Sequence, residues 1–125
     1  MNCSNCGIDI AEHPANRCLD ALIAEKVMRW NALGTENPPD AWEDDGDNIH
    51  TWEITIFPSF RPSIDNSASM DVLDKFGYWV IKKLGKDFNV YIENNDNVRS
   101  GLSEGTDLSL AVCRAAYLAV MEVEG

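Results

Sequence analysis

The sequence predicts an α+β domain in which three helices pack on a small, mostly antiparallel sheet. Three observations lead to this fold class. Apolar residues recur at helical spacing in three separate segments. Two intervening segments are rich in aromatic and β-branched residues, which is typical of strands. A polar NNDN run at 94–97 predicts a hairpin turn, and hairpins join antiparallel strands.

The first helix is predicted over residues 14–30, because proline is favoured at a first helical position and occupies position 14. Residues 34–50 hold two prolines, two glycines and six acidic residues, so we expect a loop without regular structure. Trp42 is expected to pin this loop to the body of the domain. The apolar stripe of the helix consists of Leu19, Leu22, Ile23, Val27 and Trp30.

A strand is predicted over residues 51–57, which read TWEITIF. A second helix is predicted over residues 67–84, with Gly85 as its stop. The buried stripe of this helix is predicted to consist of Met70, Leu73, Phe76, Val80 and Leu84.

The next strand is predicted over residues 88–93, where apolar residues at 88, 90 and 92 alternate with polar and aromatic ones. A weaker strand over 98–104 returns beside it. Thr106 is expected to cap the third helix, over residues 107–123. Arg114 is the only charged residue between positions 108 and 121, so this helix is predicted to be the buried spine of the core.

The charge balance limits the possible partners. Ten basic and 21 acidic residues give a formal net charge of −11. This argues against a general nucleic-acid binder, which needs a basic footprint on phosphates, and it leaves room for a basic protein partner. No segment supplies the ~20 apolar residues of a membrane span, and the N-terminus shows no secretory signal. Cysteines in a reducing compartment favour metal binding over disulfides.

The N-terminal segment contains a candidate metal site. Cys3, Cys6, His13 and Cys18 follow the spacing Cys-x2-Cys-x6-His-x4-Cys, which resembles a zinc knuckle with a longer loop. Four thiolate or imidazole ligands suit one structural zinc ion. The alternative is a frayed N-terminus in which Cys18 packs as a small apolar residue. We expect residues 1–15 to be an N-terminal lead-in that contributes to this zinc knuckle, and residues 16–125 to form a single α-β-α sandwich domain.

Other groups of reactive residues give weaker signals. Cys113 lies in an apolar helix, so it is predicted to be a core residue and not a nucleophile. No catalytic motif occurs, so we expect no enzyme activity. The candidate protein-binding residues are four carboxylates of the predicted loop: Glu43, Asp44, Asp45 and Asp47.

Three stretches together resemble the phage ABA sandwich domain family. They are NRCLDALIAEKVMRW at 16–30, RPSIDNSASMDVLDKF at 61–76, and DLSLAVCRAAYLAV at 107–120. The matching positions of the first block are Leu19, Asp20, Ala21, Ala24, Glu25, Lys26, Val27 and Trp30. The middle block matches at Ser63, Ile64 and Asp65, and the last at Leu110, Ala111, Cys113, Arg114, Ala115 and Ala116.

This resemblance implies an α-β-α sandwich fold and a phage or prophage origin, without a known activity. We therefore expect a phage accessory protein that works as a non-enzymatic, acidic protein-binding module in the cytoplasm of the bacterial host. Its partner would be a host or phage protein. Two alternatives stay open: a zinc-stabilised module that contacts nucleic acid or a nucleoprotein, and a small-ligand binder.

Overall fold

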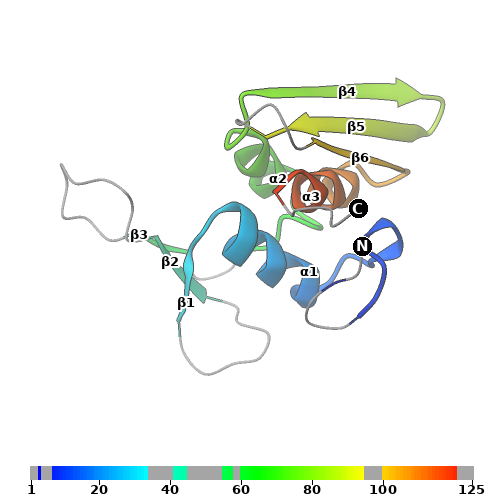
Figure 1. The fold of residues 1–125 in the computed structure, drawn as a ribbon. Helices are drawn as coiled ribbons and strands as arrows, with labels where there is room; N and C mark the ends of the chain where they lie inside the picture. The colour runs from blue at the N-terminus through cyan, green and yellow to red at the C-terminus, as the bar shows by residue number, and fades with distance from the viewer. Residues whose placement is uncertain are drawn as a thin grey trace.

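A computed structural model describes residues 3, 7–33, 41–44, 55–57, 60–94 and 100–120 (Figure 1). Helices and two antiparallel sheets alternate along the chain, which confirms the predicted α+β class. The helical elements are η1 (Ile10–Glu12), α1 (Arg17–Leu22), η2 (Ile23–Val27), α2 (Asn66–Leu73) and α3 (Leu108–Val120). The strands are β1 (Asn31–Leu33), β2 (Ala41–Asp44), β3 (Thr55–Phe57), β4 (Tyr78–Leu84), β5 (Asp87–Glu93) and β6 (Ser100–Gly105).

The first helical segment begins at Asn16, whose side-chain oxygen accepts the Leu19 N–H at 3.1 Å. After α1 the chain continues as the π-helical turn η2. The segment ends where Arg29 adopts a left-handed conformation with φ 59°. All five residues of the predicted stripe are buried, so its core-facing side is confirmed.

The smaller sheet has the order β1-β2-β3, with Trp42 of β2 paired to Ala32 and Phe57. Trp42 is only 1% exposed, which confirms it as an anchor. The expectation of a loop throughout 34–50 is wrong for residues 41–44, because strand pairing on both sides satisfies their backbone groups. The predicted strand at 51–57 is confirmed for 55–57, and its first four residues lie outside the described part.

The larger sheet has the order β4-β5-β6. The predicted second helix is wrong beyond residue 73, because residues 78–84 form β4. This run of Tyr, Trp, Val and Ile favours a strand, and it pairs along its whole length with β5. The two are joined by a turn at Gly85 and Lys86, where Gly85 has φ 64°. A glycine with positive φ at the first turn position is typical of a type II′ hairpin turn.

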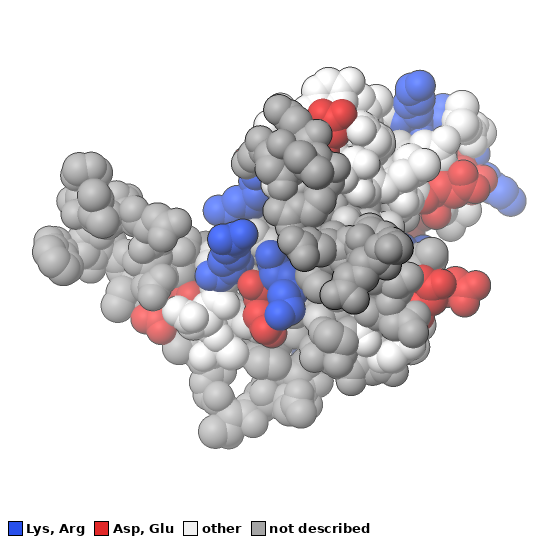
Figure 2. Space-filling model, in the orientation of Figure 1, with Lys and Arg blue, Asp and Glu red and all other residues white. Residues whose placement is uncertain are grey.

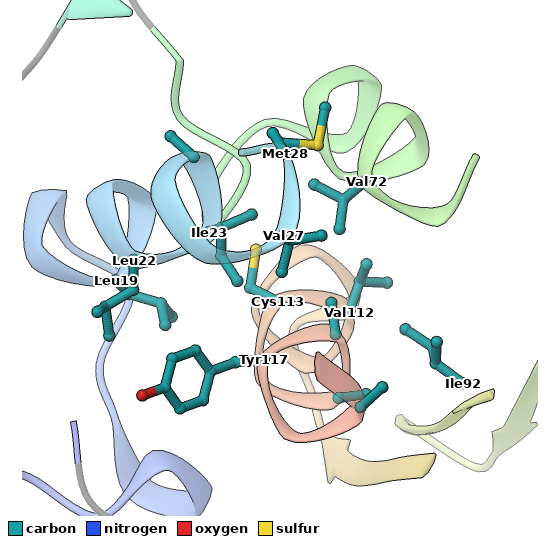
Figure 3. Close-up of a cluster of buried hydrophobic side chains, with 14 of the residues drawn as sticks. Leu19, Leu22, Ile23, Val27, Met28, Val72, Ile92, Val112, Cys113 and Tyr117 are labelled. Atoms are coloured by element: carbon teal, nitrogen blue, oxygen red, sulfur yellow. The ribbon is translucent and has the colours of Figure 1, made fainter. Parts of the chain in front are cut away.

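Helix α3 is the centre of the fold. Figure 1 shows it between the larger sheet and α1, with α2 alongside, and Figure 3 shows residues from these elements meeting around it. Eight of its residues are buried, which confirms the predicted spine. Its first turn is capped by Asp107, whose carboxylate accepts the Leu110 N–H at 3.3 Å, and not by Thr106 as expected. No helix of the described residues is long and apolar enough to cross a membrane.

Candidate metal centre

Three side chains of the N-terminal part meet in one buried cluster. The ligand atoms of Cys3, His13 and Cys18 all lie within 4.8 Å of one another. The Sγ atoms of the two cysteines are 3.7 Å apart. Cys3 and His13 are buried, and Cys18 is half-buried. The sequence prediction that these three residues come together is therefore confirmed.

Cys3 is held by a tight backbone loop. Its N–H donates to the Ile8 carbonyl at 2.8 Å, and its carbonyl accepts the Gly7 N–H at 2.9 Å. Gly7 has φ 77°, a conformation that glycine adopts without the cost borne by other residues. The loop returns the chain toward Ile10, whose side chain is fully buried. Cys3 is thus fixed against the body of the protein.

His13 is oriented through its ring. Nδ1 lies 2.9 Å from the carbonyl oxygen of Pro14. A carbonyl only accepts hydrogen bonds, so Nδ1 is the donor in this contact and Nε2 is the ring nitrogen that could ligate a metal. A histidine that ligates a metal through one nitrogen commonly donates the other N–H to a carbonyl. The Pro14 carbonyl is therefore placed to orient the ring for a metal ligand at Nε2.

Arg114 links this segment to the core helix. Its Nε and Nη2 donate to the backbone carbonyl of His13 at 3.0 and 2.6 Å. Partial burial lowers the pKa of the Arg114 guanidinium, while the charges of Asp107 and Glu12 act to raise it. Both N–H groups converge on the same oxygen, and hydrogen bonds from a charged donor are stronger than those between neutral groups. The backbone of the candidate ligand His13 is thereby fastened to α3.

The spacing of the ligand atoms suits a tetrahedral ion. Two thiolates at ~2.3 Å from zinc, separated by the tetrahedral angle, lie about 3.8 Å apart. The observed Sγ–Sγ distance of 3.7 Å agrees with this value. It is far longer than the ~2.05 Å bond of a disulfide. Thiolate and imidazole together are ligands that zinc prefers over magnesium or calcium.

Of the remaining predicted site residues, Glu43, Asp44 and Cys113 lie in the described part of the chain. Cys6 lies outside the described residues. Glu43 is half-buried in β2, and Asp44 ends that strand. Asp45 and Asp47 also lie outside the described part, so the acidic binding surface stays a prediction. Cys113 is completely buried in α3, as the core interpretation requires.

Sequence reasoning did not identify Arg114 as part of this site. The available signal was its position as the only charged residue in an otherwise apolar helix. A half-buried guanidinium needs acceptors, but the acceptor of Arg114 lies 101 residues earlier in the chain. The role of Pro14 as acceptor for the His13 ring was likewise not predicted.

The fold and this cluster define an α+β domain with a candidate thiolate–imidazole metal centre. The chain belongs to the phage ABA sandwich domain family, whose match covers residues 21–117, more than three quarters of its length. No curated protein and no solved structure matches the chain. Cys3, His13 and Cys18 precede the matched region, whereas Arg114 lies within it.

Proposed function

We propose that the chain is a non-enzymatic protein-binding module of a phage, and that a structural zinc ion fastens its N-terminal segment to the helical core. The observation that carries the metal proposal is the clustering of the Cys3, His13 and Cys18 ligand atoms within 4.8 Å. In this proposal the fourth ligand is Cys6, which completes the Cys-x2-Cys pair. Four protein ligands leave no open coordination position, so the ion stabilises the fold and performs no chemistry.

The position of the ligands supports a structural role. Cys3 belongs to the N-terminal loop, His13 follows η1, and Cys18 lies in the first turn of α1. An ion between them would join three short segments that cannot build a core of their own. Because such a site does not exist in the unfolded chain, the free energy of metal binding adds to the free energy of folding.

The burial of Cys113 in the core argues against this thiol as a nucleophile, which is in line with a binding role. Burial raises the pKa of the Cys113 thiol well above its usual range, and the charges of Asp20 and Asp107 raise it further. This thiol is therefore protonated at neutral pH and enclosed by the core. A protein partner in the cytoplasm of the bacterial host, met through a strongly charged surface, fits the net charge of −11.

The metal proposal is tested by the zinc content and melting temperature of the purified chain, compared with two Cys→Ala variants. We expect one zinc per chain in the wild type and in Cys113→Ala, and a loss of zinc in Cys18→Ala. Removing zinc with a chelator should lower the melting temperature of the wild type and leave that of Cys18→Ala unchanged. If Cys18→Ala keeps both its metal and its melting temperature, the proposal is wrong.

A further inference from the structure

Strand β4 lies beyond the area of the larger sheet that α3 covers. Helix α3 packs on β5 and β6, and β4 forms the outer edge beside β5. Large apolar side chains of β4 are therefore left in solvent. Tyr78 is 53% exposed, Trp79 42% and Leu84 60%. Half of the six large apolar side chains that are exposed in the described part belong to this one strand.

The outer backbone edge of β4 has no partner strand among the described residues. The two-residue turn makes Leu84 and Asp87 the hydrogen-bonded pair that closes the hairpin. Hydrogen-bonded and non-hydrogen-bonded pairs then alternate along an antiparallel ladder. It follows that Trp79, Ile81 and Lys83 direct their N–H and C=O groups away from β5. Within the described residues β4 pairs with β5 alone, so these groups face an unfilled strand position.

The charge at this edge is opposite to that of the whole chain. Lys82, Lys83 and Lys86 are all exposed and form the tightest basic cluster of a protein with net charge −11. Figure 2 shows basic side chains at the end of the molecule where Figure 1 places the turn between β4 and β5. Lys83 also lies over the Phe88 ring, with its Nζ 5.8 Å from the ring centroid. The edge therefore offers an apolar half at Tyr78–Ile81 and a basic half at Lys82–Lys86.

Two other arrangements, pairing of β4 with a second copy of itself and strand addition at β6, fit less well. Lysines on an edge strand discourage pairing with an identical strand, because like charges then meet. The opposite edge, β6, carries no lysine, contains Gly101, Gly105 and Glu104, and lies close against α3. A lysine-bearing edge of this kind admits a strand with carboxylates and repels a basic one.

We propose that the β4 edge binds an extended acidic segment of a partner protein, which adds to the sheet as a fourth strand beside β4. Backbone hydrogen bonds to Trp79, Ile81 and Lys83 would supply affinity, as in other cases of strand addition. Apolar residues of the partner lie near Tyr78 and Trp79, and its carboxylates lie near Lys82 and Lys86. This inference rests on the proposed protein-binding role and is independent of the metal.

The test uses a labelled short peptide with Val and Thr in one half and Glu and Asp in the other. Binding to the full chain is followed by fluorescence anisotropy, with the zinc content of the same sample measured in parallel. A matched peptide carries Lys in place of Glu and Asp, and a third probe is a thymidine oligonucleotide. We expect only the acidic peptide to bind, with affinity that falls as salt rises.

Two sets of variants separate charge from strand pairing. Reversing two charges with Lys82→Glu and Lys86→Glu should weaken the binding of the acidic peptide by about tenfold or more, because attraction becomes repulsion. Lys83→Pro removes both the charge and the outward backbone N–H of this residue. Lys83→Gln removes the same charge but keeps the N–H. We expect Lys83→Pro to abolish binding and Lys83→Gln to retain most of it. Proline is tolerated where the N–H faces away from the sheet, and a melting curve checks that both variants fold.

Amide hydrogen exchange gives the direct readout. Peptide binding should slow exchange at Trp79, Ile81 and Lys83 and leave the alternate residues of β4, which already pair with β5, unchanged. Failure of the peptide to bind a zinc-loaded, folded chain would overturn this inference and leave the metal proposal standing. Equal binding of the lysine peptide, preference for the oligonucleotide, or concentration-dependent dimerisation through β4 would each overturn it as well.

Discussion

The guanidinium of Arg114 donates two hydrogen bonds to the backbone carbonyl of His13, across 101 residues of sequence. This contact joins the backbone of a candidate metal ligand to the central helix, so the core helps to position that residue. The zinc ion would then be sensitive to a residue that does not touch it.

Replacing Arg114 by Met should weaken zinc binding and destabilise the domain together. The variant keeps a long side chain for packing but leaves the His13 carbonyl without its donors. We expect a loss of about 1–3 kcal/mol in the free energy of unfolding and a roughly 10-fold or greater loss of zinc affinity. Competition with a chromophoric chelator measures the affinity.

The absorption spectrum of the cobalt-substituted protein distinguishes positioning from general destabilisation. If Arg114 positions His13, the ligand-field bands of Arg114→Met should shift, whereas Arg114→Lys should restore part of the wild-type spectrum. An unchanged spectrum and an unchanged affinity would show that this contact does not act on the metal site.

Gly101 marks the closest approach between β6 and α3. A Cβ atom added there would lie 1.9 Å from the carbonyl oxygen of Ala115 and 2.8 Å from the backbone nitrogen of Ala119. Because both neighbours are backbone atoms, they cannot rotate away. Gly101→Ala should therefore destabilise the protein by at least the ~1–3 kcal/mol typical of overpacking. Gly105→Ala is the control, since its nearest neighbour is the end of the Arg114 side chain at 4.0 Å. Equal denaturation midpoints for the two variants would contradict this packing.

Trp42 lies in a central strand and Trp79 in an edge strand, so their substitutions should have different effects on stability. Trp42 is 1% exposed in β2, whereas Trp79 is 42% exposed in β4. Trp42→Ala should cost about 3–5 kcal/mol of unfolding free energy, the value usual for a buried aromatic residue. Trp79→Ala should cost much less. Denaturant titrations of both variants check this order, and a larger loss for Trp79→Ala would be incompatible with the small sheet anchoring to the core.

The Cys113 thiol should make stability decline at alkaline pH. Its pKa is raised in the folded state by burial first, and then by the charges of Asp20 and Asp107. Below the ordinary thiol pKa of about 8.5, both folded and unfolded chains hold the proton, so this stability is fully present. As pH rises further, the unfolded chain loses the proton and the folded chain does not. Stability therefore falls by up to about 1.4 kcal/mol per pH unit until the folded pKa is reached.

Cys113→Ala separates this effect from other groups that titrate at the same pH. The variant should be less stable than the wild type at neutral pH, because it leaves a small cavity. The difference should shrink above pH ~8.5, since only the wild type carries the buried thiol. A difference in unfolding free energy that stays constant with pH would refute the assignment.

The sequence predicts the helical core well, because its periodic signals are local. The stripe from Leu19 to Trp30 and the apolar spine around Arg114 each occupy one continuous segment with helical spacing. Their burial in the structure follows directly from that pattern. The alternation of Phe88, Val90 and Ile92 also correctly separates the faces of β5: the latter two are buried against α3.

The error in the second helix has an identifiable cause. Phe76, Val80 and Leu84 are spaced by four residues, and this spacing fits a helix as well as it fits alternate positions of a strand that follows a turn. The strand prevails because residues 78–84 pair in register with 87–93 across a two-residue turn. That pairing satisfies the backbone hydrogen-bonding groups along β4 that face β5. The spacing of apolar residues within one segment carries no information about such pairing.

The candidate site could be predicted in part. Ligand spacing alone predicted that Cys3, His13 and Cys18 lie together, because their short separations in the sequence match those of zinc ligands. The supporting contacts from Pro14 and Arg114 depend on tertiary packing. The outer edge of β4, which no other described strand covers, could not be predicted either, because residues 78–84 were expected to be helical.

The measurement that tests the zinc proposal most directly is X-ray absorption at the zinc edge of the purified chain. We expect three sulfur atoms at ~2.3 Å and one nitrogen at ~2.0 Å around the zinc ion, from the three N-terminal cysteines and His13. In Cys18→Ala, one of these sulfur atoms should be lost or the metal should be absent. Coordination by oxygen and nitrogen alone, or a folded protein without zinc, would contradict the zinc proposal.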